Sequence, residues 1–205
     1  LFRMSISSNL NTVLSSLDNE ITLVAVSKKK NNSCILEAYD AGQKIFGENK
    51  VQELTKKAKS LPKDISWHMI GHLQTNKVKF IAPFVDLIHG VDSIKLLKEI
   101  NKRAEQNNRV IDCLLQVHIA TESTKFGFDI TEVKEVITIA KEFQNIRIIG
   151  LMGMATFTSN NNLINGEFNK LNQIFKQYKS DDFNTLETYF FGDAIGEANE
   201  LIADK

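Results

Sequence analysis

The sequence has few of the features that mark disulfide-rich, membrane-bound or nucleic-acid-binding proteins. Its two cysteines, Cys34 and Cys113, lie far apart in unrelated segments and predict neither a disulfide framework nor a metal site, so we interpret them as reduced core cysteines. The chain has no apolar run of about 18 residues and no hydrophobic signal core, which predicts a cytoplasmic protein without a membrane partner. Lys plus Arg and Asp plus Glu both number 25, so no net charge attracts nucleic acid.

The sequence also lacks the glycine-rich nucleotide-binding motifs GxGxxG and GxxxxGK[ST]. Two histidines, His68 and His72, are four residues apart. On a strand with about 3.3 Å per residue their side chains would lie roughly 13 Å apart, which is too far for one metal ion. We therefore expect no metal. His68 is predicted to be a core histidine, whereas His72 lies beyond the carboxyl end of its strand, where it could face a ligand.

The most informative stretch of the sequence is Ile21–Lys30 (ITLVAVSKKK), an apolar run that ends in three lysines. Its apolar, β-branched run reads as a central parallel strand, and in parallel α/β folds the chemistry lies at the carboxyl ends of the strands. Lys28 is the first residue to reach that end. A lysine that forms an imine must be partly desolvated or lie beside other cations, and Lys29 and Lys30 are such cations. From this stretch alone, a solvated lysine loop is the alternative.

Strand-like and helix-like segments alternate along the chain, which predicts parallel strands joined by helical crossovers. The predicted strands are 21–28, 44–46, 66–70, 85–89, 113–119, 147–152 and fragments between 183 and 192, and the predicted helices are 9–18, 33–39, 51–60, 76–80, 93–107, 131–143, 166–178 and 194–204. With 205 residues, of which Met4 is the more natural start, we expect one domain over residues 4–205. A closed (β/α)8 barrel needs eight strands, and the last βα unit has too few residues.

Five motifs follow one another in a fixed order. They are LVAVSK (23–28), FGEN (46–49) with Gln52-Glu53, WHMIGHLQTNK (67–77), KFGF (125–128) and GLMGMA (150–155). Together they resemble the pyridoxal-phosphate homeostasis protein family, also called the YggS/PROSC family, over about residues 10–175. The resemblance implies a single α/β (β/α)8 TIM barrel like the N-terminal domain of alanine racemases, incomplete here near the C-terminus.

The same resemblance implies that pyridoxal 5′-phosphate (PLP) is bound as a Schiff base to Lys28. Asn49, His72 and Met152 are its further expected cofactor-binding residues, and Thr188 matches the Ser/Thr that holds the phosphate in the family. Taken alone, Asn49 could equally belong to a strand-to-helix turn with an N-cap, and Met152 could be core filler. No catalytic or metal-binding residue is assigned.

The family resemblance implies a PLP carrier in vitamin B6 homeostasis without a defined turnover. A PLP-dependent racemase-like enzyme is the alternative, and a barrel that has lost its cofactor and serves protein contacts is a third hypothesis. We expect PLP and apo PLP enzymes as partners, and a monomer.

The phosphate-binding stretches of the family, a Ser-x-Gly-Met-Ser turn and an Arg-Ile-Gly-Ser/Thr strand, are not intact in this sequence. A barrel without them would expose unpaired backbone. We therefore predict a further segment of roughly 25 to 30 residues, the length of a βα unit, between Leu186 and Thr188. An abnormal Cα spacing between Ser180 and Gly192 would reveal it.

Overall fold

The computed structural model describes residues 5–122, 126–178 and 188–192. The chain forms two compact units, which we treat separately. Unit 1 comprises residues 1–71, 84–86 and 187–205, and unit 2 comprises residues 72–83 and 87–186. The prediction of one domain over residues 4–205 stays a prediction.

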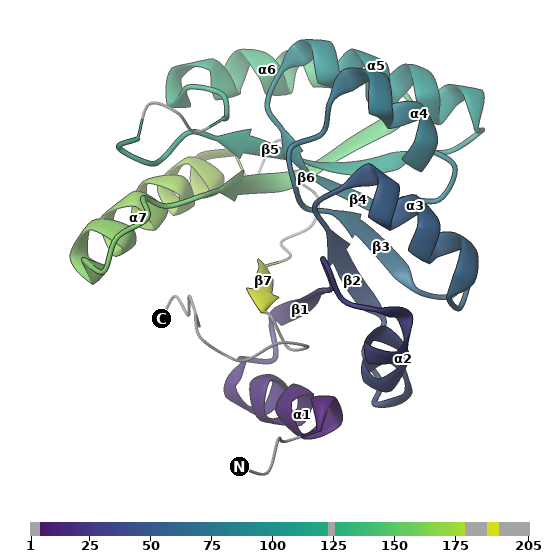
Figure 1. Cartoon of the computed structure of the whole chain (residues 1–205). Coiled ribbons are helices and arrows are strands. Elements are labelled where there is room, and N and C mark those ends of the chain that lie inside the picture. Colours follow the sequence, from purple (N-terminus) through teal and green to yellow (C-terminus); the bar gives the residue numbers. More distant parts are fainter. Residues whose placement is uncertain (1–4, 123–125, 179–187, 193–205) are drawn as a thin grey trace. The chain divides into compact units, whose positions relative to one another are not determined.

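Unit 1 is a parallel sheet with helices packed against it. Its strands lie in the order β3-β2-β1-β7, and every neighbouring pair is parallel (Figure 1). Helix α3 packs on β2 and β3, and Leu10 of α1 forms a buried cluster with Leu23 of β1. The elements are α1 (Ile6–Ser16), β1 (Ile21–Val26), α2 (Asn32–Asp40), β2 (Ile45–Glu48), α3 (Val51–Ser60), β3 (Ser66–Met69) and β7 (Thr188–Gly192).

Unit 2 continues the alternation of strands and helices. Its strands lie in the order β4-β5-β6, again parallel, and α5, α6 and α7 all contact β6 (Figure 1). The buried positions of α5 recur with a helical period, so one face of this helix covers the sheet. The elements are η1 (Thr75–Lys77), α4 (Val78–Ile81), β4 (Leu87–Val91), α5 (Ile94–Gln106), β5 (Ile111–Val117), η2 (Ile130–Glu132), α6 (Val133–Ala140), β6 (Ile146–Gly153) and α7 (Asn161–Tyr178).

Several helices start at other residues than the sequence predicts, and α1, for example, begins at Ile6 instead of residue 9. Helix α2 is capped by Asn31 instead of Ser33, because the Asn31 side chain accepts a hydrogen bond from the Cys34 amide. Helix α7 begins at Asn161, five residues before the predicted start at residue 166. There the Asn160 side chain accepts hydrogen bonds from two backbone amides of the first turn, so asparagine acts as a cap.

Several predictions fall outside the described residues. These are the C-terminal helix over 194–204, the strand fragments before Thr188, and the extra segment between Leu186 and Thr188 with its Cα spacing. Among the helices that the structure describes, none is long and apolar enough to cross a membrane.

Candidate functional site

In unit 1, polar residues gather where β1 and β2 end. Lys28 follows the last residue of β1 by two positions, and Asn49 follows β2 directly. The parallel register pairs Val26 with Gly47, and the Ser27 amide extends the ladder by donating to the Gly47 carbonyl at 3.0 Å. Lys28 and Asn49 each follow the Val26–Gly47 pair by two residues. Both residues are exposed.

The two sides of β1 differ in their surroundings. Leu23 packs against α1, and Ser27, which lies on the same side by alternation, contacts Glu48. The alternation ends there, because Lys28 and Lys29 form a turn that the Lys30 amide closes by donating to the Ser27 carbonyl. Val24 lies on the side of β1 that faces the Gly47 Cα, where an added Cβ would be 3.1 Å from the Val24 side chain.

Beneath Lys28 lies a buried acid. The Glu48 side chain is fully buried, and its Oε1 accepts a hydrogen bond from the Ser27 hydroxyl at 2.5 Å. Burial raises the pKa of this carboxyl, while hydrogen bonds from Lys57 and Ser27 act in the opposite direction. Neither Ser27 nor Lys57 was predicted from the sequence as a member of this site.

Asn49 is held in place by the chain that follows β3. Helix α3 takes Lys50 as its N-cap residue, so the interpretation of Asn49 as the cap is wrong. A Cβ on Gly71 would lie 2.5 Å from the Asn49 carbonyl oxygen and 2.7 Å from its Cα. Only glycine lets the two backbone segments approach this closely, and this approach fixes the Asn49 backbone.

In unit 2, His72 is the centre of a second polar group. Its Nδ1 lies 3.1 Å from the Asp92 carboxylate, and its ring stacks on Phe126 with the centroids 4.2 Å apart. Asp92 follows β4, and Phe126 lies in the loop after β5. A carboxylate at Nδ1 favours the tautomer in which Nδ1 carries the proton, so Nε2 is available to accept a hydrogen bond.

The loop that carries Phe126 is fixed to β5. The buried Gln116 side chain donates to the Phe126 carbonyl at 3.0 Å, and the Phe128 amide donates to the Gln116 carbonyl at 2.8 Å. Between them, Gly127 has φ +140°, and a Cβ there would lie 2.6 Å from the His118 nitrogen. The glycine of the KFGF motif therefore serves a close backbone approach, which positions Phe126 against His72.

The two remaining predicted cofactor residues lie elsewhere. Met152 is buried in β6, opposite Gln116 of β5, whereas the nearby Met154 is half exposed. Thr188 is the first residue of β7, and its backbone pairs with Ile21 at the amino end of β1. The register thus separates Thr188 from Lys28, which follows the carboxyl end of β1.

His68 differs from His72 in its environment. It is buried in β3, as the sequence predicted, and burial lowers its pKa to about 4. A histidine in this state is neutral at physiological pH, so His68 belongs to the core and not to the candidate site.

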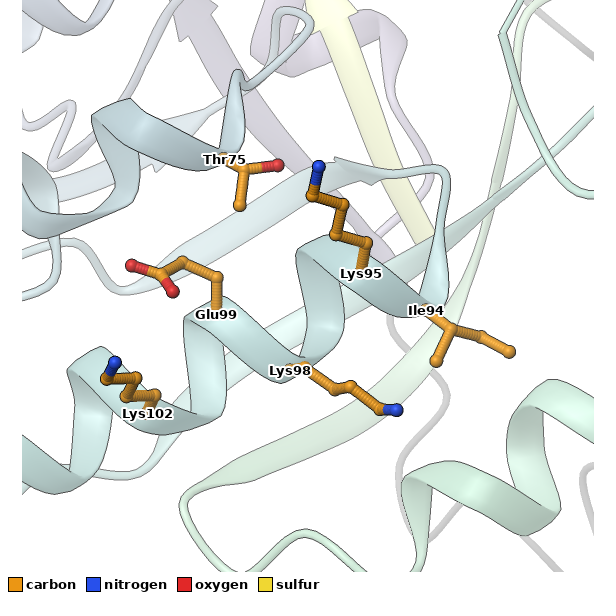
Figure 2. Close-up of a pocket in the computed structure, with 6 residues that line it drawn as sticks. All are labelled: Thr75, Ile94, Lys95, Lys98, Glu99 and Lys102. Atoms are coloured by element: carbon orange, nitrogen blue, oxygen red, sulfur yellow. The ribbon is translucent and has the colours of Figure 1, made fainter.

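A hollow of about 460 Å³ lies along α5 in unit 2. Its lining residues are Thr75, Ile94, Lys95, Lys98, Glu99 and Lys102. In Figure 2 Thr75 and Lys95 point into the same space, whereas Lys98 points away from Thr75. Glu99 already pairs with Arg103 on the same helix, at 2.6 Å. Because these lysines diverge along an exposed helix face, we do not include the hollow in the candidate site.

Comparison with known proteins gives consistent matches. The family model of the alanine racemase N-terminal domain matches residues 3–188. A protein from Aquifex aeolicus named pyridoxal phosphate homeostasis protein is 39% identical over 158 residues, which cover 77% of this chain and 69% of that protein. A protein of the same name from Haemophilus influenzae is 33% identical over 192 residues, covering 86% of this chain and 80% of the relative.

Solved structures agree with these matches. PipY of Synechococcus elongatus, solved without PLP, is similar with a TM-score of 0.81 and 31% identity, over 86% of this chain and 83% of PipY. The structure of PipY with PLP bound is similar with a TM-score of 0.77 and 30% identity, over the same shares of the two chains. An alanine racemase from Clostridium difficile matches with a TM-score of 0.73 and 12% identity, over 93% of this chain and 51% of the racemase. These matches confirm the prediction that the chain has an α/β fold like that of the alanine racemase N-terminal domain.

Proposed function

Because the chain belongs to the alanine racemase N-terminal domain family and, within it, to the pyridoxal phosphate homeostasis proteins, we propose that it binds PLP and acts in PLP homeostasis, with the cofactor held as an imine on Lys28. One observation carries this proposal. An exposed lysine follows the carboxyl end of a buried parallel strand, two residues after the Val26–Gly47 pair, and the exposed Asn49 follows the same pair by two residues on the β2 side.

The residues around Lys28 fit the cofactor. The Lys28 amine would hold PLP through its aldehyde, with which an amine can form a C=N bond with loss of water. Lys29 and Lys30 add positive charge next to this amine, and this charge attracts an anionic ligand. The exposed Asn49 side chain offers both hydrogen-bond donors and an acceptor to a polar ring.

The other assignments stay predictions. His72 offers an exposed imidazole held by Asp92, whereas the burial of Met152 favours a packing role. The role of Thr188 in phosphate binding rests on the sequence resemblance. Apo PLP enzymes as recipients, a monomeric state and a cytoplasmic location also rest on the sequence. Transfer of PLP to an apoenzyme and light scattering would test the first two.

The experiment is trapping of the imine. Purified protein is incubated with PLP, its visible absorbance is recorded, and the C=N bond is reduced with borohydride. Peptide mapping by mass spectrometry then locates the adduct. We expect the adduct on Lys28, and its absence from a Lys28→Ala variant. An adduct that persists in Lys28→Ala and maps to Lys29 or Lys30 would contradict the assignment to Lys28, and no adduct in the wild type would contradict the proposed function.

The enzyme alternative has weaker support. The likeness to alanine racemases is at 12% identity, and at that level it supports the fold alone. Racemisation assays with the PLP-loaded protein would detect such an activity.

A further inference from the structure

Lys57 is a buried lysine whose ammonium is fully used in hydrogen bonding. Its side chain is 7% exposed although it lies on α3, a helix whose other lysines are on the surface. The Nζ donates to the Glu48 carboxylate at 2.6 Å and to the Ser27 carbonyl at 2.8 Å, and it lies 3.4 Å from the Glu53 carboxylate. An ammonium has three donors, so these three acceptors satisfy it.

These contacts reach the backbone on both sides of Lys28. The carbonyl of Ser27, which precedes it, accepts from Lys57, and the amide of Lys29, which follows it, donates to the Glu53 carboxylate at 2.8 Å. The Lys29 amide lowers the pKa of the Glu53 carboxyl, which shows that the carboxylate is the form that this contact favours. Both peptide groups that flank Lys28 are therefore bound to one cluster, Glu48, Glu53 and Lys57.

The backbone at this point has an unusual conformation. Lys29 has φ 61°, in the left-handed region that residues other than glycine seldom adopt. The Lys30 amide closes the turn by donating to the Ser27 carbonyl at 3.0 Å. A strained residue keeps such a conformation only when its surroundings impose it, and the Lys29–Glu53 contact does so here.

Fold stability is a weak explanation for this cluster. Removing a lysine and a glutamate from water has a large cost, and apolar replacements of such buried pairs are often neutral or stabilising. The cluster is also concentrated on one short turn instead of being spread through the core. Its placement on the peptides that flank Lys28 indicates a role in orienting that residue.

We propose that Glu53 and Lys57, which contact each other directly while Lys57 also binds Glu48, are positioning residues that fix the Lys28 turn so that its amine meets the PLP aldehyde. This inference rests on the proposed function of Lys28. Neither residue needs to touch the cofactor. They act through the backbone, by holding the peptide groups before and after Lys28.

The test uses two variants with matched controls. Glu53→Ala removes the acceptor of the Lys29 amide, and Lys57→Met removes the ammonium while keeping a long apolar side chain. Gln52→Ala and Lys56→Met make the same kinds of change at exposed positions of α3. Glu53→Gln keeps an acceptor oxygen for the Lys29 amide and serves as the conservative rescue. The Glu53 side chain is 31% exposed, so Glu53→Ala is the variant that keeps its fold if Lys57→Met does not.

Two quantities are measured. The first is the PLP concentration that gives half-maximal borohydride trapping on Lys28, which we expect to rise about tenfold or more in Glu53→Ala and Lys57→Met, since a small misplacement of a reacting group has effects of this size. The two controls and Glu53→Gln should match the wild type. The second is hydrogen exchange of the Lys29 amide without PLP, which should be faster in Glu53→Ala than in the wild type or in Gln52→Ala.

The outcomes separate this inference from the proposed function. If the wild type traps PLP on Lys28 and both variants trap it equally well, the positioning role is overturned and the proposed function stands. Equal exchange of the Lys29 amide in the wild type and in Glu53→Ala also overturns it, whatever PLP does. A wild type that traps no PLP overturns the proposed function, and the positioning role with it.

Discussion

The close contact between Gly71 and Asn49 makes a quantitative prediction. In Gly71→Ala the new Cβ would lie 2.5 Å from the Asn49 carbonyl oxygen, 2.7 Å from its Cα and 3.0 Å from its carbonyl carbon. Ordinary contacts of a Cβ begin at 3.4 Å, so the two segments must separate by roughly 1 Å. All three atoms belong to the backbone, and no side chain can rotate away to relieve the contact.

The cost follows from this geometry. Inserting a methyl group into a well-packed region without side-chain freedom destabilises a protein by about 1 to 3 kcal/mol. Because the atoms that must move belong to Asn49, the displacement also reaches the proposed cofactor site. We therefore expect Gly71→Ala to lower the free energy of unfolding by about 2 kcal/mol and to weaken PLP trapping as well.

The assay is denaturant unfolding, with imine trapping on the same preparations. A control is Gly166→Ala in α7, where an added Cβ would meet nothing within 4 Å. In a helix this change should stabilise the protein by about 0.5 to 1 kcal/mol. The two alanine variants should thus shift stability in opposite directions. If Gly71→Ala unfolds at the wild-type denaturant concentration, the close approach of Gly71 and Asn49 is not a feature of the folded protein.

Three further predictions concern single side chains. Burial lowers the pKa of His68 to about 4, so between pH 4 and 6.5 the unfolded chain binds a proton at this histidine more readily than the folded chain does. The folded protein therefore has its full stability above pH 6.5 and loses roughly 3 kcal/mol of it as the pH falls toward 4. The His68→Gln variant should lack this part of the pH dependence in denaturant unfolding. Lys28→Ala should change the unfolding free energy by less than about 0.5 kcal/mol, because the side chain is exposed, and a larger loss would point to a structural role. His72→Ala should keep the fold but weaken the retention of PLP in equilibrium dialysis, and unchanged retention would remove His72 from the proposed site.

The parts of the fold that the sequence predicts are those with a strong local pattern. The apolar run before Lys28 defines β1, and the alternation of strand and helix predicts the parallel pairing that both units show. The helix starts of α2 and α7 were predicted at the wrong residues because several polar residues near each start can cap a helix. Which of these polar residues caps the helix depends on where the preceding segment places the chain in the fold.

The positions of Lys28 and Asn49 at strand ends follow from the sequence, but the cluster beneath them does not. Lys57 lies three residues after the buried Leu54, on the apolar face of α3, where the pattern predicts a hydrophobic residue. A charged residue at such a position needs a partner, and only the fold reveals that Glu48 of β2 is within 2.6 Å. The sequence therefore shows that Lys57 is an exception to the apolar pattern of α3. It does not show that Lys57 links this helix to the peptides that flank Lys28, because that link depends on contacts between residues up to thirty positions apart in the chain.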